Sequence, residues 1–450
     1  MRTRGDEGEL SRASIAANFG DLHAPLSEAQ AVVEAARCLY CYDAPCVRAC
    51  PTAIDIPTFI HQIRTGNVDG SARTILSANI MGGTCARVCP TEVLCEEACV
   101  VNHTEDAPVK IGLLQRHSVD SLLAKGGPHP FRRAPDSGFR LAVIGAGPAG
   151  LSFAHRASML GHHVTVFERD EKPGGLNEYG LAAYKMVDDF AQAEISFLLG
   201  LGGIEIRAGK ALGEGLELAD LLRDYDAVFI GVGLARPAPL DIPGRALPGV
   251  RDALDFIRDI RCAPDKASVK VGRSVVVIGG GNTAIDAAVQ AQCLGAEQVT
   301  LVYRRGRTEM SATGWEQELA ASSGVAFRLW SAPVAFKGEG ALAAAEFAAT
   351  RLVEGTLTLC EQRAQIPCDM ALIAIGQTLG ETLAAASGLA VKGGRIAVDA
   401  NYRTSLPGVY AGGDCIGSGE DLTVQAVEDG KRAAIGLDRE LRARGKGGRR

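Results

Sequence analysis

Two stretches of the chain share one order of features: an apolar run, a glycine-rich turn and an amphipathic segment. Residues 141–144 lead into Gly145-Ala-Gly-Pro-Ala-Gly150, and residues 274–278 lead into Gly279-Gly-Gly-Asn-Thr-Ala284. A strand, such a turn and a helix make a dinucleotide site, because the glycines let the backbone approach a pyrophosphate and the helix start presents free amides to it. The pattern predicts two Rossmann-like α/β dinucleotide-binding domains.

The first site has features that favour FAD. The apolar run 164–167 ends at Glu168, and an acid there accepts hydrogen bonds from ribose hydroxyls and repels a 2′-phosphate. Residues 404–414, which end in Gly-Gly-Asp414, resemble the second FAD fingerprint of flavoproteins with two dinucleotide domains. That resemblance implies that the aspartate binds the ribityl chain and that the next helix points at the isoalloxazine. The residues predicted to bind FAD are Gly145, Gly147, Pro148, Ala149, Gly150, Glu168, Gly175, Leu176, Gly413, Asp414, Thr423 and Val424.

The second site lies between the two FAD segments, which predicts that a nicotinamide domain is inserted into the flavin domain. Its second strand is followed by Arg304 and Arg305 rather than by an acid. These arginines are either ligands of a 2′-phosphate, which would favour NADP(H), or surface charges beside a tolerant site. The residues predicted to bind NAD(P) are Gly279, Gly281, Asn282, Thr283, Ala284, Arg304 and Arg305.

Eight of the thirteen cysteines lie between positions 38 and 99, in two groups that both contain a cysteine followed by proline. They are Cys38, Cys41, Cys46 and Cys50, then Cys85, Cys89, Cys95 and Cys99. Clustered thiols with a Cys-Pro step are typical of [4Fe–4S] binding, whereas a zinc site usually has paired C-x2-C units and only one is present. The apolar spacing of residues 56–79, broken at Gly66-Asn67, predicts helices between the two groups.

Ferredoxin spacing predicts how the thiols are shared, because the last cysteine of such a run serves the other cluster. Cluster 1 is then expected to use Cys38, Cys41, Cys46 and Cys99. Cluster 2 would use Cys50, Cys89 and Cys95, which leaves one position open. Cys85 is a candidate for that position because it offers a sulfur atom, as the other ligands do. The alternative is that Cys85 is a buried free thiol.

The net charge and the distribution of apolar residues argue against several classes of protein. The net charge of −6 argues against a nucleic-acid surface, and neither a secretory signal nor an apolar run long enough to span a membrane is present, so we expect a cytoplasmic protein. The five remaining cysteines form no close pair, so disulfide chemistry is not expected.

The expected domains are an α-helical Fe–S domain (1–130), a first FAD part (138–235), an NAD(P)H domain (236–380), a second FAD part (381–440) and a disordered basic tail (441–450).

From about residue 37 to 434 the chain resembles the electron-input module of dihydropyrimidine dehydrogenase. The resemblance is carried by Arg37-Cys-Leu-Tyr-Cys-Tyr-Asp-Ala-Pro-Cys46, Cys50-Pro-Thr-Ala-Ile-Asp-Ile-Pro-Thr-Phe-Ile60, Thr84-Cys-Ala-Arg-Val-Cys-Pro-Thr91 and Pro108-Val-Lys-Ile-Gly-Leu-Leu-Gln115. It implies that Gln115 completes cluster 2 and that Cys85 is not a ligand. A departure from the family pattern is the run Gly180-Leu-Ala-Ala-Tyr-Lys185 near the flavin.

The same resemblance implies a function. Hydride would pass from NAD(P)H to FAD, and single electrons would pass through two [4Fe–4S] clusters to a partner subunit with an FMN-containing barrel that reduces uracil or thymine. NAD(H) is implied by the family, and NADP(H) stays open because of the local arginines. Two alternatives stay open: the small subunit of glutamate synthase or a related NAD(P)H-acceptor oxidoreductase, and a redox sensor that does not turn over.

Overall fold

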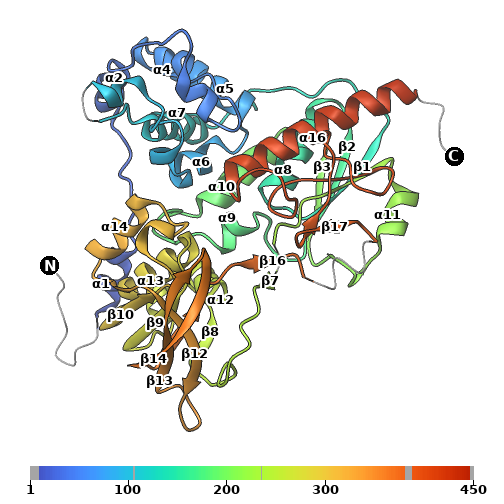
Figure 1. The fold of residues 1–450 in the computed structure, drawn as a ribbon. Helices are drawn as coiled ribbons and strands as arrows, with labels where there is room; N and C mark the ends of the chain where they lie inside the picture. The colour runs from blue at the N-terminus through green and yellow to red at the C-terminus, as the bar shows by residue number, and fades with distance from the viewer. Residues whose placement is uncertain (1–9, 105–106, 235, 381–387, 446–450) are drawn as a thin grey trace. The chain divides into compact units, whose positions relative to one another are not determined.

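The computed structural model describes residues 10–104, 107–234, 236–380 and 388–445 (Figure 1). The chain divides into two compact units. Unit 1 comprises Met1–Leu22, Tyr179–Val187 and Arg236–Gln377, and unit 2 comprises His23–Glu178, Asp188–Ala235 and Thr378–Arg450. Among the described helices, none combines the length and the apolar character needed to cross a membrane.

The cysteine-rich part of unit 2 is helical. Its elements are α2 (Glu28–Ala35), α3 (Pro45–Ala49), α4 (Ile56–Arg64), α5 (Val68–Ala78), α6 (Gly82–Val88), η1 (Thr91–Val93), η2 (Val100–His103) and α7 (Ile111–Lys125). The predicted break at Gly66-Asn67 separates α4 from α5, where the Asn67 side chain accepts from the amide of Gly70 at 3.0 Å and so caps α5. Ile56, Phe59 and Ile63 of α4 are buried in the core of unit 2.

A five-stranded parallel sheet forms the rest of unit 2, in the order β19-β6-β1-β2-β3. Its strands are β1 (Arg140–Ile144), β2 (His163–Phe167), β3 (Ile204–Arg207), β6 (Ala227–Ile230) and β19 (Val409–Ala411). The helices of this part are α8 (Pro148–Met159), α9 (Leu176–Tyr179), α10 (Phe190–Leu199), α11 (Leu218–Asp224) and α16 (Thr423–Arg444). Helices α8 and α16 pack closely (Figure 1): a Cβ on Gly430 would lie 2.1 Å from the carbonyl oxygen of Ala149.

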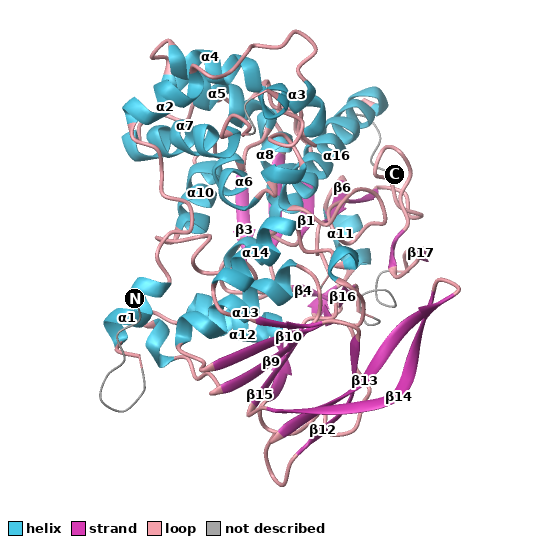
Figure 2. Cartoon of the chain, turned by 60° about the vertical axis from the view of Figure 1, so that its left-hand side comes forward, coloured by secondary structure: helices cyan, strands magenta, loops and turns pink. Residues whose placement is uncertain are grey.

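Unit 1 contains a second parallel sheet, in the order β11-β10-β9-β15-β8. Its strands are β8 (Val250–Asp252), β9 (Ser274–Ile278), β10 (Gln298–Val302), β11 (Ala326–Arg328) and β15 (Met370–Ile373). Its helices are α1 (Arg12–Asn18), α12 (Ala253–Cys262), η3 (Lys266–Ser268), α13 (Asn282–Leu294), η4 (Arg307–Glu309) and α14 (Gly314–Ser322). Figure 2 shows the long antiparallel strands β12 (Ser331–Lys337), β13 (Ala344–Val353) and β14 (Thr356–Pro367) of the same unit.

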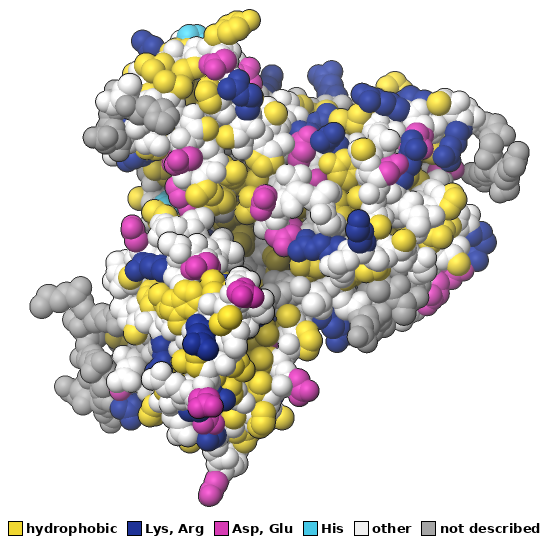
Figure 3. Space-filling model, in the orientation of Figure 1, with side chains coloured by type: hydrophobic (Ala, Val, Ile, Leu, Met, Phe, Trp, Pro, Cys, Tyr) yellow, Lys and Arg dark blue, Asp and Glu magenta, His cyan; other side chains and the backbone are white. Residues whose placement is uncertain are grey.

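Several short strands complete the structure. They are β4 (Ala211–Leu212), β5 (Gly215–Leu216), β7 (Arg236–Pro237), β16 (Gln377–Thr378), β17 (Val391–Lys392) and β18 (Arg395–Ile396). On the face drawn in Figure 3, basic and acidic side chains are interspersed with apolar ones.

The N-terminal segment differs from the sequence-based expectation. Ile15 and Phe19 of α1 are buried in the core of unit 1, and α1 contacts α13. Residues 10–22 therefore pack with unit 1 rather than with the helical Fe–S part, because their apolar side chains find an apolar face there. At the other end, α16 continues to Arg444, and residues 446–450 of the expected tail lie outside the described residues, as do residues 381–387 at the start of the expected second FAD part.

Candidate functional site

The first glycine-rich turn lies between β1 and α8, and two of its glycines leave no room for a side chain. A Cβ on Gly145, which has φ +96°, would lie 2.6 Å from the carbonyl oxygen of Gly231, and one on Gly150 would lie 1.9 Å from the carbonyl oxygen of Gly145. Helix α8 begins with Pro148 after Gly147, and no side chain caps it in the described structure. The amides of its first turn are therefore available to an anion.

Glu168 lies directly after β2, beside this turn. Its carboxylate is 7% exposed and accepts from the amides of Ala146 at 2.7 Å and Asp170 at 2.8 Å. Burial raises the pKa of Glu168 above its usual range. The acid expected to recognise the ribose is thus held against the glycine-rich turn by backbone donors.

The other residues predicted to bind FAD come to the same place in unit 2. A Cβ on Gly175 would lie 3.0 Å from Cα of Gly147, and one on Gly413 would lie 2.9 Å from Cβ of Ala149. At the start of α16, the hydroxyl of Thr423 donates to Oδ1 of Asn177 at 3.0 Å, next to Leu176. Val424 is buried, so its side chain serves the core. The structure therefore brings the segments around residues 145–150, 168, 175 and 413 together.

The loop that contains Gly413 and Asp414 depends on a residue that the sequence did not single out. The buried carboxylate of Asp429, on α16, accepts from the amide of Gly413 at 2.9 Å and from Gln425 at 2.8 Å. Burial raises the pKa of Asp414 to about 6. An acid on the buried face of the amphipathic segment 423–444 was the signal that could have identified Asp429.

The second glycine-rich turn lies in unit 1, between β9 and α13. A Cβ on Gly279 would lie 2.2 Å from the carbonyl oxygen of Ala374, whereas Ala284 is accommodated as a buried side chain. Helix α13 begins after Gly281, again with no side-chain cap in the described structure. Asn282 and Thr283 open the helix, so this turn also leaves amides available for a pyrophosphate.

Arg304 and Arg305 follow β10 beside this turn. A Cβ on Gly280 would lie 2.5 Å from the ring of Tyr303, so the turn passes close to this side chain. Only the backbone carbonyls of the two arginines are bonded, to Thr350 and Trp330. Within the described part of the chain, neither guanidinium group has a hydrogen bond or an ion pair, so both positive charges are available to a ligand.

Unit 1 also contains a buried ionic cluster of Lys185, Asp286 and Glu316, which the sequence did not predict. Nζ of Lys185 lies 2.7 Å from Oδ1 of Asp286 and 2.5 Å from Oε1 of Glu316, and the Tyr184 hydroxyl donates to Asp286 at 3.3 Å. Asp286 belongs to the second turn of α13. The run 180–185, which departs from the family pattern, is therefore anchored to the helix of the second dinucleotide site.

Four of the cysteines line one cavity: Cys38, Cys41, Cys46 and Cys99. Its other walls are mostly apolar and include Ile56 and Ile60 of α4. Burial, followed by the neighbouring thiols of Cys38 and Cys99, raises the pKa of Cys46 to about 12. These are the four thiols that ferredoxin spacing predicts for cluster 1, and a cavity lined by four sulfurs fits a group of that chemistry.

The thiols predicted for cluster 2 also lie near one another. A hydrogen bond with Cys85 and then burial raise the pKa of Cys89, and the thiols of Cys95 and Cys50 add to the effect. Gln115 is buried on α7, and its Nε2 donates to the carbonyl oxygen of Gly82 at 2.6 Å. Cys85 is buried beside Cys89, so both candidates for the open ligand position lie in this region.

Among the described residues, no three His, Cys, Asp or Glu side chains are grouped for binding a single metal ion.

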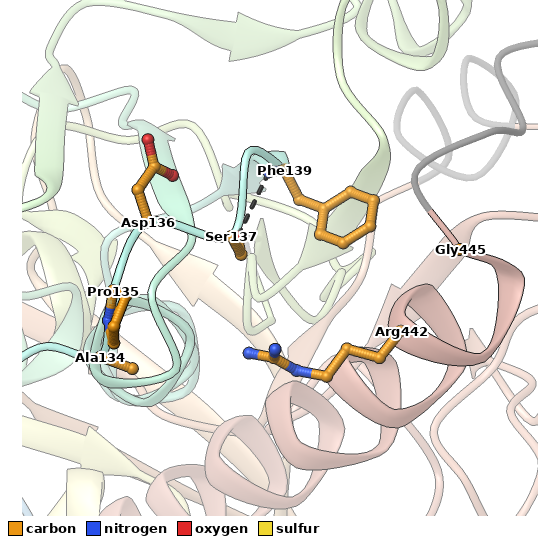
Figure 4. A pocket seen from close by; sticks show the side chains of 7 residues that line it. All are labelled: Ala134, Pro135, Asp136, Ser137, Phe139, Arg442 and Gly445. Atoms are coloured by element: carbon orange, nitrogen blue, oxygen red, sulfur yellow. Dashed lines mark hydrogen bonds between the residues drawn. The ribbon is translucent and has the colours of Figure 1, made fainter.

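A separate cavity of about 450 Å³ contains none of the predicted site residues. It lies between residues 134–139 and the end of α16, where Ser137, Phe139 and Arg442 are among its lining residues (Figure 4). The hydroxyl of Ser137 and Nδ1 of His162 lie 2.6 Å apart, and Nε2 of His162 lies 3.0 Å from Asp438. These contacts join the loop to α16.

Comparison with known proteins agrees with both parts of this arrangement. The family model for pyridine nucleotide-disulphide oxidoreductases matches residues 139–430. The chain belongs to this family. A second model, for the 4Fe–4S cluster domain II of dihydropyrimidine dehydrogenase, matches residues 15–127.

Relatives and structures of known proteins extend this result. The NAD-dependent dihydropyrimidine dehydrogenase subunit PreT of Escherichia coli (strain K12) is 34% identical over 411 residues, 91% of this chain and 94% of that protein. The glutamate synthase [NADPH] small chain of the same organism is 32% identical over 443 residues, 93% of each chain. The structure of Mycobacterium tuberculosis FprA in complex with NADPH matches with a TM-score of 0.58 and 20% identity, over 70% of this chain and 86% of that one.

These matches confirm the expected resemblance and cofactors. This member of the pyridine nucleotide-disulphide oxidoreductase family is an NAD(P)H-dependent oxidoreductase that uses FAD and 4Fe–4S clusters. Its fold combines an N-terminal Fe–S domain with Rossmann-like sheets. All thirteen cysteines lie among the described residues, and none of them forms a disulfide.

Proposed function

We propose that the chain is the electron-input subunit of a dihydropyrimidine dehydrogenase. It would accept hydride from NAD(P)H on FAD and send single electrons through two [4Fe–4S] clusters to a partner subunit, which holds FMN and its own clusters and reduces uracil or thymine. The observation that carries the proposal is the burial of Gln115 against α6, the helix that carries Cys85 and is followed by Cys89, where its amide donates to the carbonyl oxygen of Gly82.

The orientation of Gln115 supports its place in the ligand set. A backbone carbonyl can only accept a hydrogen bond, so the side-chain nitrogen of Gln115 must face Gly82 and Oε1 is left as the donor atom for iron. We therefore assign Cys38, Cys41, Cys46 and Cys99 to cluster 1, and Cys50, Cys89, Cys95 and Gln115 to cluster 2. Cys85 would then be a thiol that hydrogen-bonds the ligand Cys89.

The two glycine-rich turns would hold the dinucleotides. Amides of α8 would bind the FAD pyrophosphate and Glu168 the adenosine ribose, while Gly413, Asp414 and the start of α16 would hold the ribityl chain and the flavin. Amides of α13 would bind the nicotinamide dinucleotide. Bound FAD supplies the conversion from a two-electron hydride to single electrons.

We also propose that the NAD(P)H domain (236–380) is inserted into the flavin domain (138–235 and 381–440), as expected from the sequence, and that residues 10–22 belong with the NAD(P)H domain rather than with the Fe–S domain. Strand β19, which follows that segment in the chain, pairs with β6, which precedes it, and this pairing supports the insertion.

The test separates electron input from pyrimidine chemistry. The isolated chain with its cofactors should oxidise NADH or NADPH with artificial acceptors and leave uracil unchanged, and adding the barrel subunit should start uracil reduction. Uracil reduction by the isolated chain would overturn the proposal, as would a lack of any NAD(P)H oxidation.

A second candidate is the small subunit of glutamate synthase, favoured by the 93% coverage of each chain in that match. Co-expression with each large subunit separates the two. Stable association and electron delivery with a glutamine-dependent amidotransferase chain, but not with the barrel subunit, would favour this alternative.

A further inference from the structure

The peptide group between Gly82 and Gly83 is hydrogen-bonded on both sides by side chains from other helices. On its carbonyl side, Gly82 accepts from Nε2 of Gln115, on α7, at 2.6 Å. On its amide side, Gly83 donates to Oε1 of Glu194, on α10, at 2.8 Å. A single peptide group therefore connects the proposed amide ligand of cluster 2 with a carboxylate on α10, the helix that follows Gly175 and Leu176 of the proposed flavin site in the chain.

Glu194 is only 1% exposed, and the hydrogen bonds that it accepts from described residues come from α6. Besides Gly83, it accepts from the amide of Thr84 at 3.0 Å and from the hydroxyl of Thr84. These amides belong to the first turn of α6, where the N–H groups have no acceptors within the helix itself. The residue that caps the other end of this helix is Cys89, a proposed ligand of cluster 2. Glu194 thus holds one end of a helix whose other end carries a thiol of that cluster.

The two glycines make this contact possible. A Cβ on Gly83 would lie 2.4 Å from Cζ of Phe190 and 2.9 Å from Oε1 of Glu194. A Cβ on Gly82 would lie 2.6 Å from Cγ2 of Ile75. Any larger residue at either position would push α6 away from α10 or α5, so the pair Gly82-Gly83 serves the close approach of these helices.

The charges near Glu194 come from α6 and α7. Arg87 of α6 stacks on Phe190, with its guanidinium carbon 3.4 Å from the ring centroid, and donates to Gly83 O at 3.0 Å. Behind it, Asp120 of α7 accepts from Arg87 at 2.8 Å and from Arg116 at 3.2 Å. Burial raises the pKa of Glu194 to about 7, and Arg87 opposes this effect.

We propose that Glu194 is a positioning residue for cluster 2. Through the 82–83 peptide, Glu194 orients and polarises Gln115 and so sets the reduction potential of that cluster. This inference rests on the proposed function, because it takes Gln115 as a ligand. A carboxylate on the amide side of a peptide makes its carbonyl a stronger acceptor, since hydrogen bonds in a chain polarise one another. The Gln115 amide is then held more firmly, and its Oε1 donates more strongly to iron.

The sign of the effect follows from charge. Reduction adds one electron to the cluster and neither forms nor breaks a covalent bond. A negative Glu194 opposes the added charge, whereas a neutral side chain does not. Loss of the charge should therefore raise the potential of cluster 2. The potential in the unmodified protein should also fall as the pH rises from 6 to 8, because Glu194 ionises in that range.

The test is a redox titration of the full chain with FAD and both clusters, followed by electron paramagnetic resonance at pH 6, 7 and 8. At pH 8, Glu194→Gln should shift the reduced-to-oxidised ratio of cluster 2 about tenfold toward the reduced form, which is about 59 mV for one electron. It should also remove most of the pH dependence and leave cluster 1 unchanged. An unchanged cluster 2 potential in Glu194→Gln would overturn the inference.

Two further variants complete the design. Thr84→Val keeps the carboxylate and removes its hydroxyl donor, so it should change the cluster 2 potential or its pH dependence even if Glu194→Gln does not fold. Glu205→Gln removes an exposed carboxylate of β3 that pairs with Arg207, and it should leave both potentials unchanged. If neither Glu194→Gln nor Thr84→Val affects cluster 2, Glu194 has only a structural role.

The proposed ligand set is tested separately by Gln115→Ala. If this variant leaves the spectra of both clusters unchanged, the assignment of Gln115 fails and the present inference fails with it. If Gln115→Ala alters cluster 2 while Glu194→Gln and Thr84→Val do not, the proposed function stands and only the role of Glu194 is rejected.

Discussion

The two glycine-rich turns share a sequence pattern but differ in what surrounds them. In unit 2, Glu168 comes directly after β2, the strand beside the one that leads into the turn. It is buried and held by two backbone amides. In unit 1 the equivalent place is followed by Arg304 and Arg305, whose guanidinium groups have no partner among the described residues. From this comparison we expect that the pattern specifies a pyrophosphate site, whereas the end of the second strand specifies which ribose the site accepts.

The two turns also differ at their last position, and this gives the largest predicted effect. A Cβ on Gly150 would lie 1.9 Å from the carbonyl oxygen of Gly145, a clash with backbone that no side-chain rotation relieves. Gly150→Ala should therefore displace α8, destabilise unit 2 by about 1–3 kcal/mol or more and remove most of the flavin. Flavin absorbance per chain and thermal unfolding measure both effects.

Gly147→Ala is the matched control for that variant. A Cβ on Gly147 would meet nothing closer than 3.9 Å, so its unfolding temperature should stay near that of the unmodified protein. If Gly150→Ala binds FAD as well as the unmodified chain does, the close approach of α8 to the turn is not needed for the cofactor.

The second prediction concerns Glu168. Glu168→Gln keeps the shape of the side chain and removes its charge, so hydrogen bonds to the ribose hydroxyls should weaken by about 1.5–3 kcal/mol, or roughly 10- to 100-fold in FAD affinity. Titration of the flavin-free protein with FAD measures this change. Glu171→Gln, an exposed acid nearby, should not change the affinity. Equal affinities in Glu168→Gln and the unmodified chain would contradict a ribose role for this carboxylate.

The sequence was sufficient for these turns because their signals are local. A strand, a turn and a helix within about 25 residues leave a pattern that can be read directly. The same holds for the thiols, whose spacing agrees with the four cysteines found around one cavity. The antiparallel strands β12–β14 were not predicted, because their burial alternates weakly and β14 is largely exposed.

Other features could not be predicted because they depend on contacts far apart in the chain. Glu194 meets Gly83 over 111 positions, and Lys185 meets Glu316 over 131. Each of these residues lies in a segment where a charged side chain would ordinarily be read as exposed. Tertiary packing alone decides that they are buried and paired.

The third prediction tests the arginines of the second turn. Arg304→Ala should weaken the use of NADPH about tenfold, because it removes a charge-assisted contact with the 2′-phosphate, and should change the use of NADH little. Steady-state kcat/KM with an artificial acceptor, for both nucleotides, measures the difference. Arg363→Ala, another exposed arginine of unit 1, is the control. If the ratio of the two kcat/KM values is the same in Arg304→Ala as in the unmodified chain, Arg304 is a surface charge and NAD(H) is the better assignment.

The smallest effect is expected at Ala284, which occupies in unit 1 the position of Gly150 in unit 2. Ala284 is fully buried, so the second helix stands far enough from its turn to accept a methyl group. Ala284→Gly removes that methyl group from a helix and should cost about 1 kcal/mol of stability, with little change in KM for the nucleotide. Chemical unfolding and kinetics measure the two quantities. If Ala284→Gly raised the KM for the nucleotide as strongly as Gly150→Ala lowers flavin binding, the comparison would break, because the last motif position would then have the same role in both turns. A stability loss without a change in KM would sharpen it, because helix spacing rather than the motif would decide which residue each turn accepts.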